Sequence, residues 1–487
     1  MNKEKLFWNG IFLVDSDCEM TGTLSLNGED SVLHLWTNHP IEVDSLNRET
    51  ITGILDNQKK VSLFNCIVTR GPRFYGKERC TQHYRVFPHY AVVGHHHVLY
   101  SEKAISKISF VIDDAISLFH DRTSFGTVNI PPEQMGDLTS IEIFAGNPFE
   151  GTYPILAYWT GKEEIFKANT SMGKIYARHQ PGFNMGGPDG ASITNKIWIT
   201  VEFSSPRNIG ELNVEIRNIL RFFQLVLGRP QNLLRLEIKE KELEHHESSV
   251  AYLNMYPNYP RGSGYREPDF RDILIDAGEN PEELANLLCA WLEKDKTWRT
   301  VRAVFSTGWA RGRDYGPDRI VGAANMFDLL PKDALPLSTE LDEEIEAAIE
   351  VGRSAFDKLE KSLKKDRLFF ALGNLKQPSL KEKIKHRCAL ISEVIGEDIP
   401  DVCKVTDAAV NLRNLYVHGT KMSDKRKKKL EESIDFLTDT LEFVFCVSDL
   451  VESGWDLGSW HKKRKGEGHP FASYLNSYKG RLEQFLK

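Results

Sequence analysis

An arginine and a histidine stand five positions apart near the end of an apolar, helix-like run. The segment begins at Arg413, continues through Asn414 and ends at His418, directly before Gly419. Arginine keeps its charge near neutral pH, whereas histidine titrates there. This combination suits a phosphodiester, because the cation can hold the phosphate while the imidazole moves a proton. The rest of the chain must supply the elements that position the pair.

The positioning element is a predicted helix over residues 404–418, in which apolar positions recur at helical spacing. Gly419 is a natural residue just past a helix end, so we expect the helix to end there. Residues five apart lie about 140° apart around an ideal helix. Arg413 and His418 therefore diverge unless the last turn loosens or a second protomer completes the site.

The same residues also allow a structural interpretation. Arg413 and His418 can complement the negative end of the helix dipole, and their spacing also occurs by chance. Asn414 can orient its neighbours by hydrogen bonds or be an ordinary polar residue at a helix end. The pattern alone therefore leaves both roles open.

Composition describes an ordinary globular protein of several domains. The chain has 487 residues, too many for one core, and its length suggests roughly two to four domains. Hydrophobic residues make up 41% and charged residues 27% of it. The net charge of -7 argues against a protein that wraps nucleic acid over its whole surface. Any binding of nucleic acid must use local basic patches.

Neither a signal peptide nor a membrane span is expected. No long apolar run follows residues 1–8. The most apolar candidate for a span, residues 436–447, is interrupted by polar positions that include Asp439 and Glu442. The seven cysteines are widely spaced without a Cys-x-x-Cys pair, which favours reduced thiols. We expect a cytoplasmic protein.

The first 230 residues read as a β-rich domain. Short segments rich in β-branched and aromatic residues are separated by turn signals such as Asn27-Gly28, as in an antiparallel sandwich or barrel. The expected strands are 20–26, 32–37, 51–55, 61–68, 108–112, 138–144 and 196–203.

Helical patterns dominate the remainder. Residues 231–270 read as a connector, because Pro, Gly and Tyr are abundant from Leu253 to Asp269, and an all-helical domain is expected over 271–487. The predicted fold class is therefore α+β multidomain, with an N-terminal antiparallel β-rich domain followed by an all-helical C-terminal domain. The expected helices are 213–227, 281–293, 320–330, 340–365 (with an amphipathic pattern), 380–395, 404–418 and 423–451.

Two parts of the chain resemble known families. The segment from Arg413 to His418 resembles the RNxxxH signature of the HEPN superfamily, helical domains named for higher eukaryotes and prokaryotes nucleotide-binding. The N-terminal half resembles the opening of ApeA-type antiphage proteins, which join a β-rich N-terminal domain to a C-terminal HEPN domain. The segments that carry this second resemblance are 7–10, 20–24, 32–36, 51–54 and 61–66.

The resemblance implies an antiphage defence protein of the bacterial cytoplasm. Its HEPN domain is expected to be an endoribonuclease that needs no metal and no other cofactor, with Arg413, Asn414 and His418 at the site. It implies RNA as the partner (tRNA or another host or phage RNA), a homodimer formed through the HEPN domain, and growth arrest of infected cells. The β-rich domain is expected to sense infection or restrain the nuclease; the phage trigger is not indicated.

The residue types suggest how such a site would cut RNA. A ribose 2′-OH attacks the adjacent phosphorus, and His418 takes that proton or protonates the leaving 5′-oxygen. Arg413 binds the phosphate and stabilises its developing charge. The expected ends are a 2′,3′-cyclic phosphate and a 5′-OH, and DNA should resist because it lacks the nucleophile.

Two basic runs flank the pair in the sequence. Such runs can bind an RNA backbone, but they can equally be solvated helix faces or loops. The RNA-binding candidates are Lys421, Lys425, Arg426, Lys427, Lys462, Lys463 and Arg464.

Other chemistry-bearing patterns are weaker. Cys80 and His83 with His95 and His97 are metal-ligand types, but the second pair lacks the usual spacing, so we expect ordinary histidines there. The glycine-rich stretch 181–190 matches no phosphate-loop pattern and reads as a flexible connection. Two further functions stay open: a non-catalytic RNA-binding or phage-sensing module in which the Arg–His pair only grips phosphate, and a carbohydrate- or peptide-binding sandwich with an idle helical tail.

Overall fold

The chain divides into two compact units, unit 1 over Met1–Leu292 and unit 2 over Glu293–Lys487. Unit 1 is rich in strands and unit 2 is helical, so the predicted α+β fold class is confirmed. The computed structural model describes residues 6–15, 18–38, 46–75, 81–131, 133, 155–184, 186, 190–241, 248–257, 259, 266–336, 343–374, 377–463 and 466–487.

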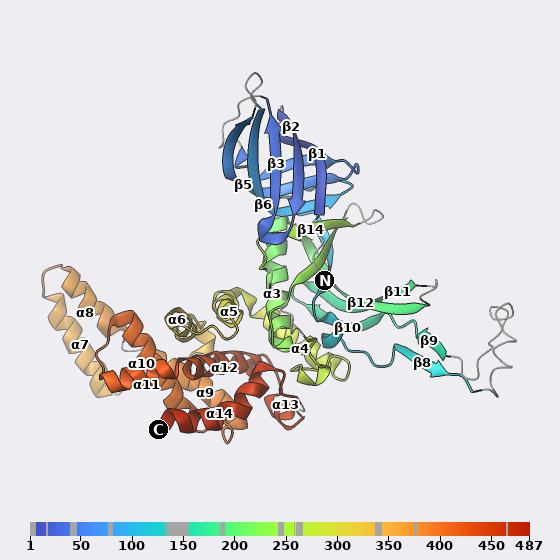
Figure 1. Cartoon of the computed structure of the whole chain (residues 1–487). Coiled ribbons are helices and arrows are strands. Elements are labelled where there is room, and N and C mark those ends of the chain that lie inside the picture. Colours follow the sequence, from blue (N-terminus) through green and yellow to red (C-terminus); the bar gives the residue numbers. More distant parts are fainter. Residues whose placement is uncertain are drawn as a thin grey trace. The chain divides into compact units, whose positions relative to one another are not determined.

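Unit 1 begins with a closed antiparallel barrel (Figure 1). Its strands pair in the order β6-β3-β2-β1-β4-β5, and β5 also pairs with β6, which closes the ring. Successive side chains point to opposite faces of a strand, so alternation in the sequence buries a core that includes Phe12, Leu24, Leu35 and Tyr84. The strands are β1 (Leu6–Asp15), β2 (Cys18–Leu26), β3 (Val32–Thr37), β4 (Thr50–Leu55), β5 (Lys60–Tyr75) and β6 (Thr81–Gly94).

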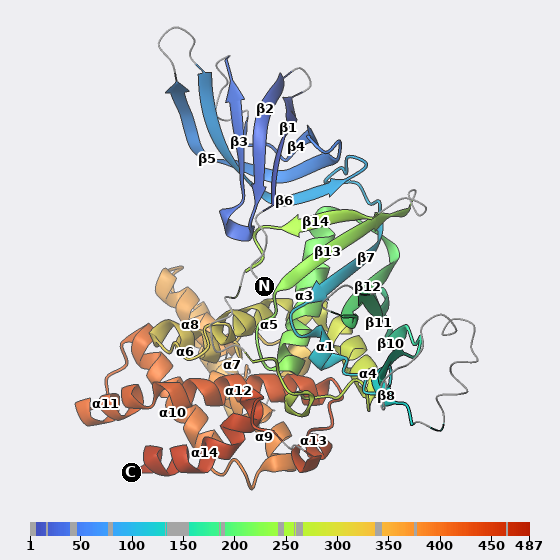
Figure 2. The same cartoon turned by 45° about the vertical axis from the view of Figure 1, so that its right-hand side comes forward.

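Strand β6 also pairs with β14 and so continues the barrel into an open sheet of order β10-β11-β12-β7-β13-β14 (Figure 2). Helix α3 (Ile209–Leu227) begins with a capping box between Asn208 and Glu211. Phe223 of α3 packs on Phe119, which packs on Phe166 of β10 and ties the helix to the sheet. The remaining elements are β7 (Ile105–Ile112), α1 (Ala115–Leu118), the paired strands β8 (Phe125–Asn129) and β9 (Ile155–Trp159), β10 (Glu164–Thr170), β11 (Gly173–Asn184), β12 (Ser192–Arg207), β13 (Leu233–Glu240), β14 (Ser249–Leu253) and α4 (Pro281–Glu293).

The structure differs from the predicted domain boundaries. The expected connector 231–270 contains β13 and β14, and the compact units divide after Leu292. Charged residues at alternate positions hid β13 in the sequence, although Leu236 and Ile238 between them are buried. The expected loop 181–190 likewise begins inside a strand, because β11 pairs with β12 as far as Asn184. The expected strand 138–144 lies outside the described residues.

Helix α12 is the central element of unit 2. It contacts α6, α9, α10, α11 and α14, and its residues are buried on almost every side from Phe436 to Leu450, as expected of a helix surrounded by others. The helices are α5 (Asp295–Trp309), α6 (Pro317–Asn325), α7 (Glu343–Asp357), α8 (Leu363–Asn374), α9 (Leu380–Ile395), α10 (Val402–His418), α11 (Asp424–Glu432), α12 (Ile434–Glu452), α13 (Leu457–Lys463) and α14 (Pro470–Leu486).

Two of the predicted helices are each two helices. The prediction of one helix over 340–365 was wrong, because α7 ends at Asp357 and α8 begins at Leu363. The apolar residues of this pair do not share one buried face: Ile349 is buried, whereas Val351 and Phe370 are exposed. The prediction of one helix over 423–451 was also wrong, because Ser433 separates α11 from α12.

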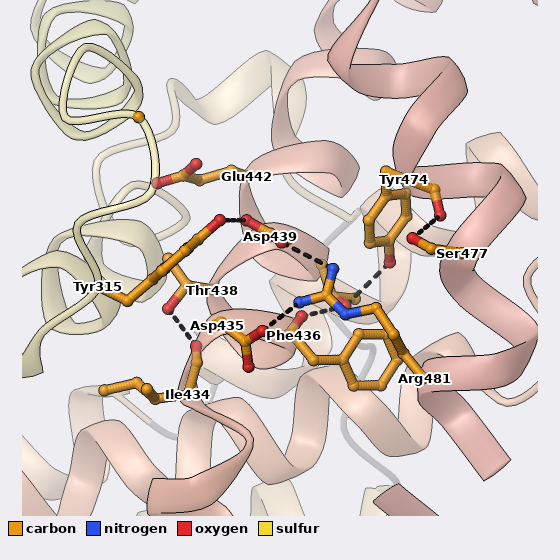
Figure 3. A network of polar contacts seen from close by, with 12 residues as sticks. Tyr315, Ile434, Asp435, Phe436, Thr438, Asp439, Glu442, Tyr474, Ser477 and Arg481 are labelled. Carbon is orange, nitrogen blue, oxygen red and sulfur yellow. Dashed lines mark hydrogen bonds and ion pairs between the residues drawn. The ribbon is translucent and has the colours of Figure 1, made fainter. Parts of the chain in front are cut away.

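Charged side chains tie α12 to its neighbours. Asp439 accepts hydrogen bonds from Tyr315 (2.7 Å) and from Arg481 of α14 (2.8 Å), as Figure 3 shows. Arg319 of α6 donates to both carboxylate oxygens of Glu442 at 2.8 Å. The polar residues that interrupt the apolar run 436–447 thus have partners within the fold. No helix in the described part of the chain is long and apolar enough to span a membrane.

Candidate active site

Helix α10 carries the predicted Arg–His pair at its C-terminal end. The helix extends to His418, and Gly419 adopts the left-handed conformation with φ of 62°. The Gly419 N–H donates to the Leu415 carbonyl at 3.0 Å, which closes the last turn. The predicted end of the helix at Gly419 is confirmed.

The Arg413 guanidinium is held mainly by residues outside its own helix. Its Nε and Nη2 donate to Asn325 Oδ1 at 3.1 and 2.8 Å, and Asn325 is the last residue of α6. Asp328 lies 3.9 Å from Nη2. The Arg413 side chain is 15% exposed, so these contacts fix a cation that is largely buried. A guanidinium held in this way keeps a fixed position at the end of α10.

Arg413 and His418 do meet, although the helix end does not loosen as expected. Arg413 Nη1 lies 3.2 Å from His418 Nε2, while α10 stays helical as far as His418. The long arginine side chain covers the angular separation that an ideal helix imposes. Because guanidinium can only donate, His418 Nε2 is the acceptor if this contact is a hydrogen bond. His418 itself is exposed.

Asn414 orients the pair rather than lying idle at the helix end. Its Oδ1 accepts from Arg413 Nη1 at 3.0 Å, so one guanidinium nitrogen contacts both Asn414 and His418. Its backbone carbonyl accepts from the Thr420 hydroxyl at 3.2 Å, which ties the loop after Gly419 to the helix. The hydrogen-bonding role is the one that this geometry favours.

Sequence reasoning missed Asn325 and Asp328. They precede Arg413 by more than eighty residues and belong to a different predicted helix. No spacing rule therefore connects them with the Arg–His segment. Only the packing of α6 against α10 brings them to Arg413.

Removing the Asn325 amide should impair any activity that depends on Arg413. The Asn325→Ala variant loses the acceptor of two Arg413 N–H groups, and the freed guanidinium would sample other positions. We expect the RNA cleavage that the family resemblance implies to fall by about tenfold to a hundredfold, the loss typical of a misplaced group. Initial cleavage rates over a range of RNA concentrations would measure it. Asn325→Asp keeps the acceptor and should keep most activity; an Asn325→Ala variant as active as the wild type would contradict the positioning role.

The basic candidates separate into two groups. Lys421 lies in the loop after Gly419, and Lys425, Arg426 and Lys427 lie on α11, which contacts α10. Lys462 and Lys463 lie on α13, which contacts α9 and lies at the other end of unit 2 from α11 in both views (Figures 1 and 2). Arg464 lies outside the described residues.

The histidine-rich region shows ring contacts in place of a metal cluster. His83 Nε2 lies 2.9 Å from His34 Nδ1, and both rings stack with Trp36. Among the residues that the structure describes, no group of three or more His, Cys, Asp or Glu side chains is placed to hold a metal. Cys80 lies outside those residues.

Cys403 in the first turn of α10 should be unusually reactive. A hydrogen bond from Cys388 of α9 lowers the pKa of the Cys403 thiol. Because the thiolate is the nucleophile, we expect iodoacetamide to modify Cys403 readily at pH 7, with a rate that falls only as the solution is made more acidic than an ordinary thiol would require. Mass spectrometry of brief alkylation pulses would measure the rate.

Cys289 is the control for exposure in that experiment, since it is also half-buried. The Cys388→Ala variant removes the hydrogen bond and should move the midpoint of the Cys403 profile to higher pH. Equal alkylation of Cys289 and Cys403 at pH 6.5 would contradict the assignment.

The helical unit, with an arginine and a histidine meeting at a helix end, has the features of a HEPN domain, and the model of the Apea-like HEPN domain matches residues 321–459. The model of ApeA N-terminal domain 1 matches residues 7–291, which is more than half of the chain. The chain therefore belongs to the ApeA family, and the predicted resemblance is confirmed. No curated protein and no solved structure matches the chain.

Family membership supports an antiphage defence role of the nuclease type. HEPN domains are generally ribonucleases, and they commonly dimerise and act on RNA.

Proposed function

We propose that this chain is a metal-independent endoribonuclease of antiphage defence, with its active site at the end of α10. The observation that carries the proposal is the 3.2 Å contact between Arg413 and His418, with the guanidinium fixed by Asn325. One group can bind the scissile phosphate and the other can transfer a proton, at a surface that a nucleic acid strand can reach.

The reaction begins when a phosphate oxygen takes up the donors of Arg413. Arg413 Nη1 then donates to the phosphate in place of His418 Nε2. His418 Nε2 is thereby free to receive the proton of the ribose 2′-OH. The 2′-oxygen bonds to phosphorus and the bond to the 5′-oxygen breaks, leaving a 2′,3′-cyclic phosphate and a 5′-OH. Arg413 stabilises the charge on the phosphate oxygens throughout.

The leaving 5′-oxygen also needs a proton, and one chain supplies one His418. A second copy of this chain can supply the acid, so the proposal includes a homodimer formed through unit 2. Exposed apolar residues on α7 and α8, among them Val351 and Phe370, support an association surface there. Sedimentation analysis of the purified chain would determine its oligomeric state.

Unit 1 is proposed to sense infection or to restrain the nuclease. Unrestrained cleavage of cellular RNA would kill the host, so a physical control is required. The consequence for an infected cell would be growth arrest in the cytoplasm, and a phage product would be the trigger.

The deciding experiment compares RNA ends from infected cells that carry the wild type or His418→Ala. Ends with a 5′-OH that appear only with the wild type would support the proposal and identify the RNA that is cut. Purified protein should form the same ends on synthetic RNA in the presence of EDTA, and a single 2′-deoxy substitution at the cut position should block cleavage.

A non-catalytic grip on phosphate is the second candidate. It is favoured by the contact that occupies His418 Nε2 in this structure. Full RNA cleavage and full phage protection by His418→Ala would remove the catalytic proposal, and retained RNA binding without any cleavage by the wild type would support this second one.

A further inference from the structure

A basic groove of about 500 Å³ lies beside α10, apart from the Arg413–His418 contact. Helices α9, α10, α11 and α14 form its walls. Its polar lining residues are Lys381, Lys404, Asp407, Asn411, Arg426 and Lys429. Leu430 and Phe485 add an apolar wall.

The charges in this groove favour an anion. Four cations face one lining carboxylate, Asp407, which lies 3.7 Å from Lys381. Lys404 pairs with Asp401 at 2.8 Å, but Lys404 is 71% exposed, so water screens that pair. Arg426 has no ion-pair partner among the residues that the structure describes. Positive charge therefore remains available, and arginine presents a planar fork of donors that matches phosphate oxygens.

The groove and His418 lie on the same side of α10. Lys404, Ala408, Asn411 and His418 follow one another at spacings of four, three and seven residues, which keeps them on one helix face. Asn411 and His418 are separated by two turns, or about 10 Å along the axis. A strand that lies along this face reaches the groove and His418 together.

We infer that the groove binds a nucleotide unit of the RNA strand on one side of the bond that is cut, with its phosphate on Arg426 and Lys404. The inference rests on the proposed function, since it places the same substrate beside His418. Arg413 starts from the opposite face of α10, nine residues after Lys404, and reaches His418 through its side chain. Phe485 gives the groove an aromatic wall beside Lys429, whose Nζ lies 5.4 Å from the ring centroid, and single-strand binding sites commonly place bases against aromatic residues. The groove would bind a nucleotide with any base, because its charged side chains contact the phosphate backbone.

The test measures binding in the absence of cleavage. The full chain with His418→Ala is titrated with a fluorescein-labelled single-stranded RNA 12-mer at several salt concentrations, and fluorescence anisotropy is followed. Adding Arg426→Ala should weaken binding by about fivefold or more, and should reduce the slope of log K against log salt by about 0.7, the value for one lost phosphate contact on a single strand.

Lys428→Ala is the matched control, because Lys428 stands two positions from Arg426 on α11 and lies 3.9 Å from Glu432, outside the groove. It should leave the affinity within about twofold of the parent, and the melting temperature of every variant should match. Asp407→Asn removes the lining carboxylate and should tighten binding severalfold. Unchanged affinity in Arg426→Ala, or weaker binding in Asp407→Asn, would overturn the inference.

Two further probes are needed. One distinguishes failure of this inference from failure of the proposed function, and the other distinguishes a nucleic acid strand from a free nucleotide as the ligand. A DNA 12-mer of the same sequence should lose affinity with Arg426→Ala as the RNA does, whether or not His418 proves catalytic. ATP is the probe for a free nucleotide: if ATP raises the melting temperature of the parent but not of Arg426→Ala, while RNA affinity is the same in both, the groove takes a small phosphorylated ligand and the inference about the strand is wrong.

Discussion

Replacing His418 by alanine should lower RNA cleavage by about 10²- to 10⁴-fold, the usual contribution of a positioned general acid or base. His418 is exposed at the end of α10, and its side chain contacts Arg413. The substitution therefore removes the proton-transfer group while the fold keeps its core. Initial rates on a fluorophore–quencher RNA, together with melting temperatures, would test both halves of this expectation.

Val417→Ala is the matched control for that variant. Val417 is 45% exposed in the same last turn of α10 and has no role in the proposed chemistry. It should cleave at nearly the wild-type rate. If His418→Ala retained more than half of the wild-type rate, or if Val417→Ala lost as much as His418→Ala, the site would have been assigned to the wrong residues.

Arg302→Ala should be among the most destabilising substitutions in unit 2. Arg302 of α5 donates to both oxygens of Asp449 of α12, with Nε at 2.8 Å and Nη2 at 2.9 Å, and both side chains are almost fully buried. Removal of the arginine leaves the buried carboxylate of Asp449 on α12 without this partner. Loss of one member of a buried pair costs about 3 to 5 kcal/mol of unfolding free energy.

Urea unfolding followed by tryptophan fluorescence would measure this loss, because Trp298 lies beside Arg302, with its ring 5.3 Å from the guanidinium. The double variant Arg302→Met with Asp449→Leu removes both charges and should recover most of the stability. A single variant with the stability of the wild type would show that water or another group replaces the arginine.

The local parts of this structure were predictable and the distant ones were not. Strands such as β2 and β3 carry their own alternation and are closed by the turn pair Asn27-Gly28, and α10 carries its own stop signal in Gly419. Strand β14 has no comparable signal, since four of its five residues pair with β6, more than 150 positions earlier. Pairing at such distances is a property of the fold and leaves no period in the sequence.

The site follows the same rule. Arg413, Asn414 and His418 were visible because they lie within one turn and a half of one helix. The expected loosening of the last turn was wrong, since an ideal helix fixes where Cβ atoms point but not how far an arginine side chain can bend back. Asn325 was invisible because it reaches Arg413 from the end of α6.

Because the two units are consecutive in the chain, the ribosome makes unit 1 before unit 2. A ribosome adds about 5 to 20 residues per second, and N-terminal domains generally fold first. His418 follows the end of unit 1 at Leu292 by more than a hundred residues, so on the order of 10 s separate their appearance. The β-rich unit can therefore finish folding before the ribosome has made the pair proposed to cut RNA. A nascent chain on the polysome is surrounded by RNA. It contains the proposed regulatory unit before it contains the proposed ribonuclease site.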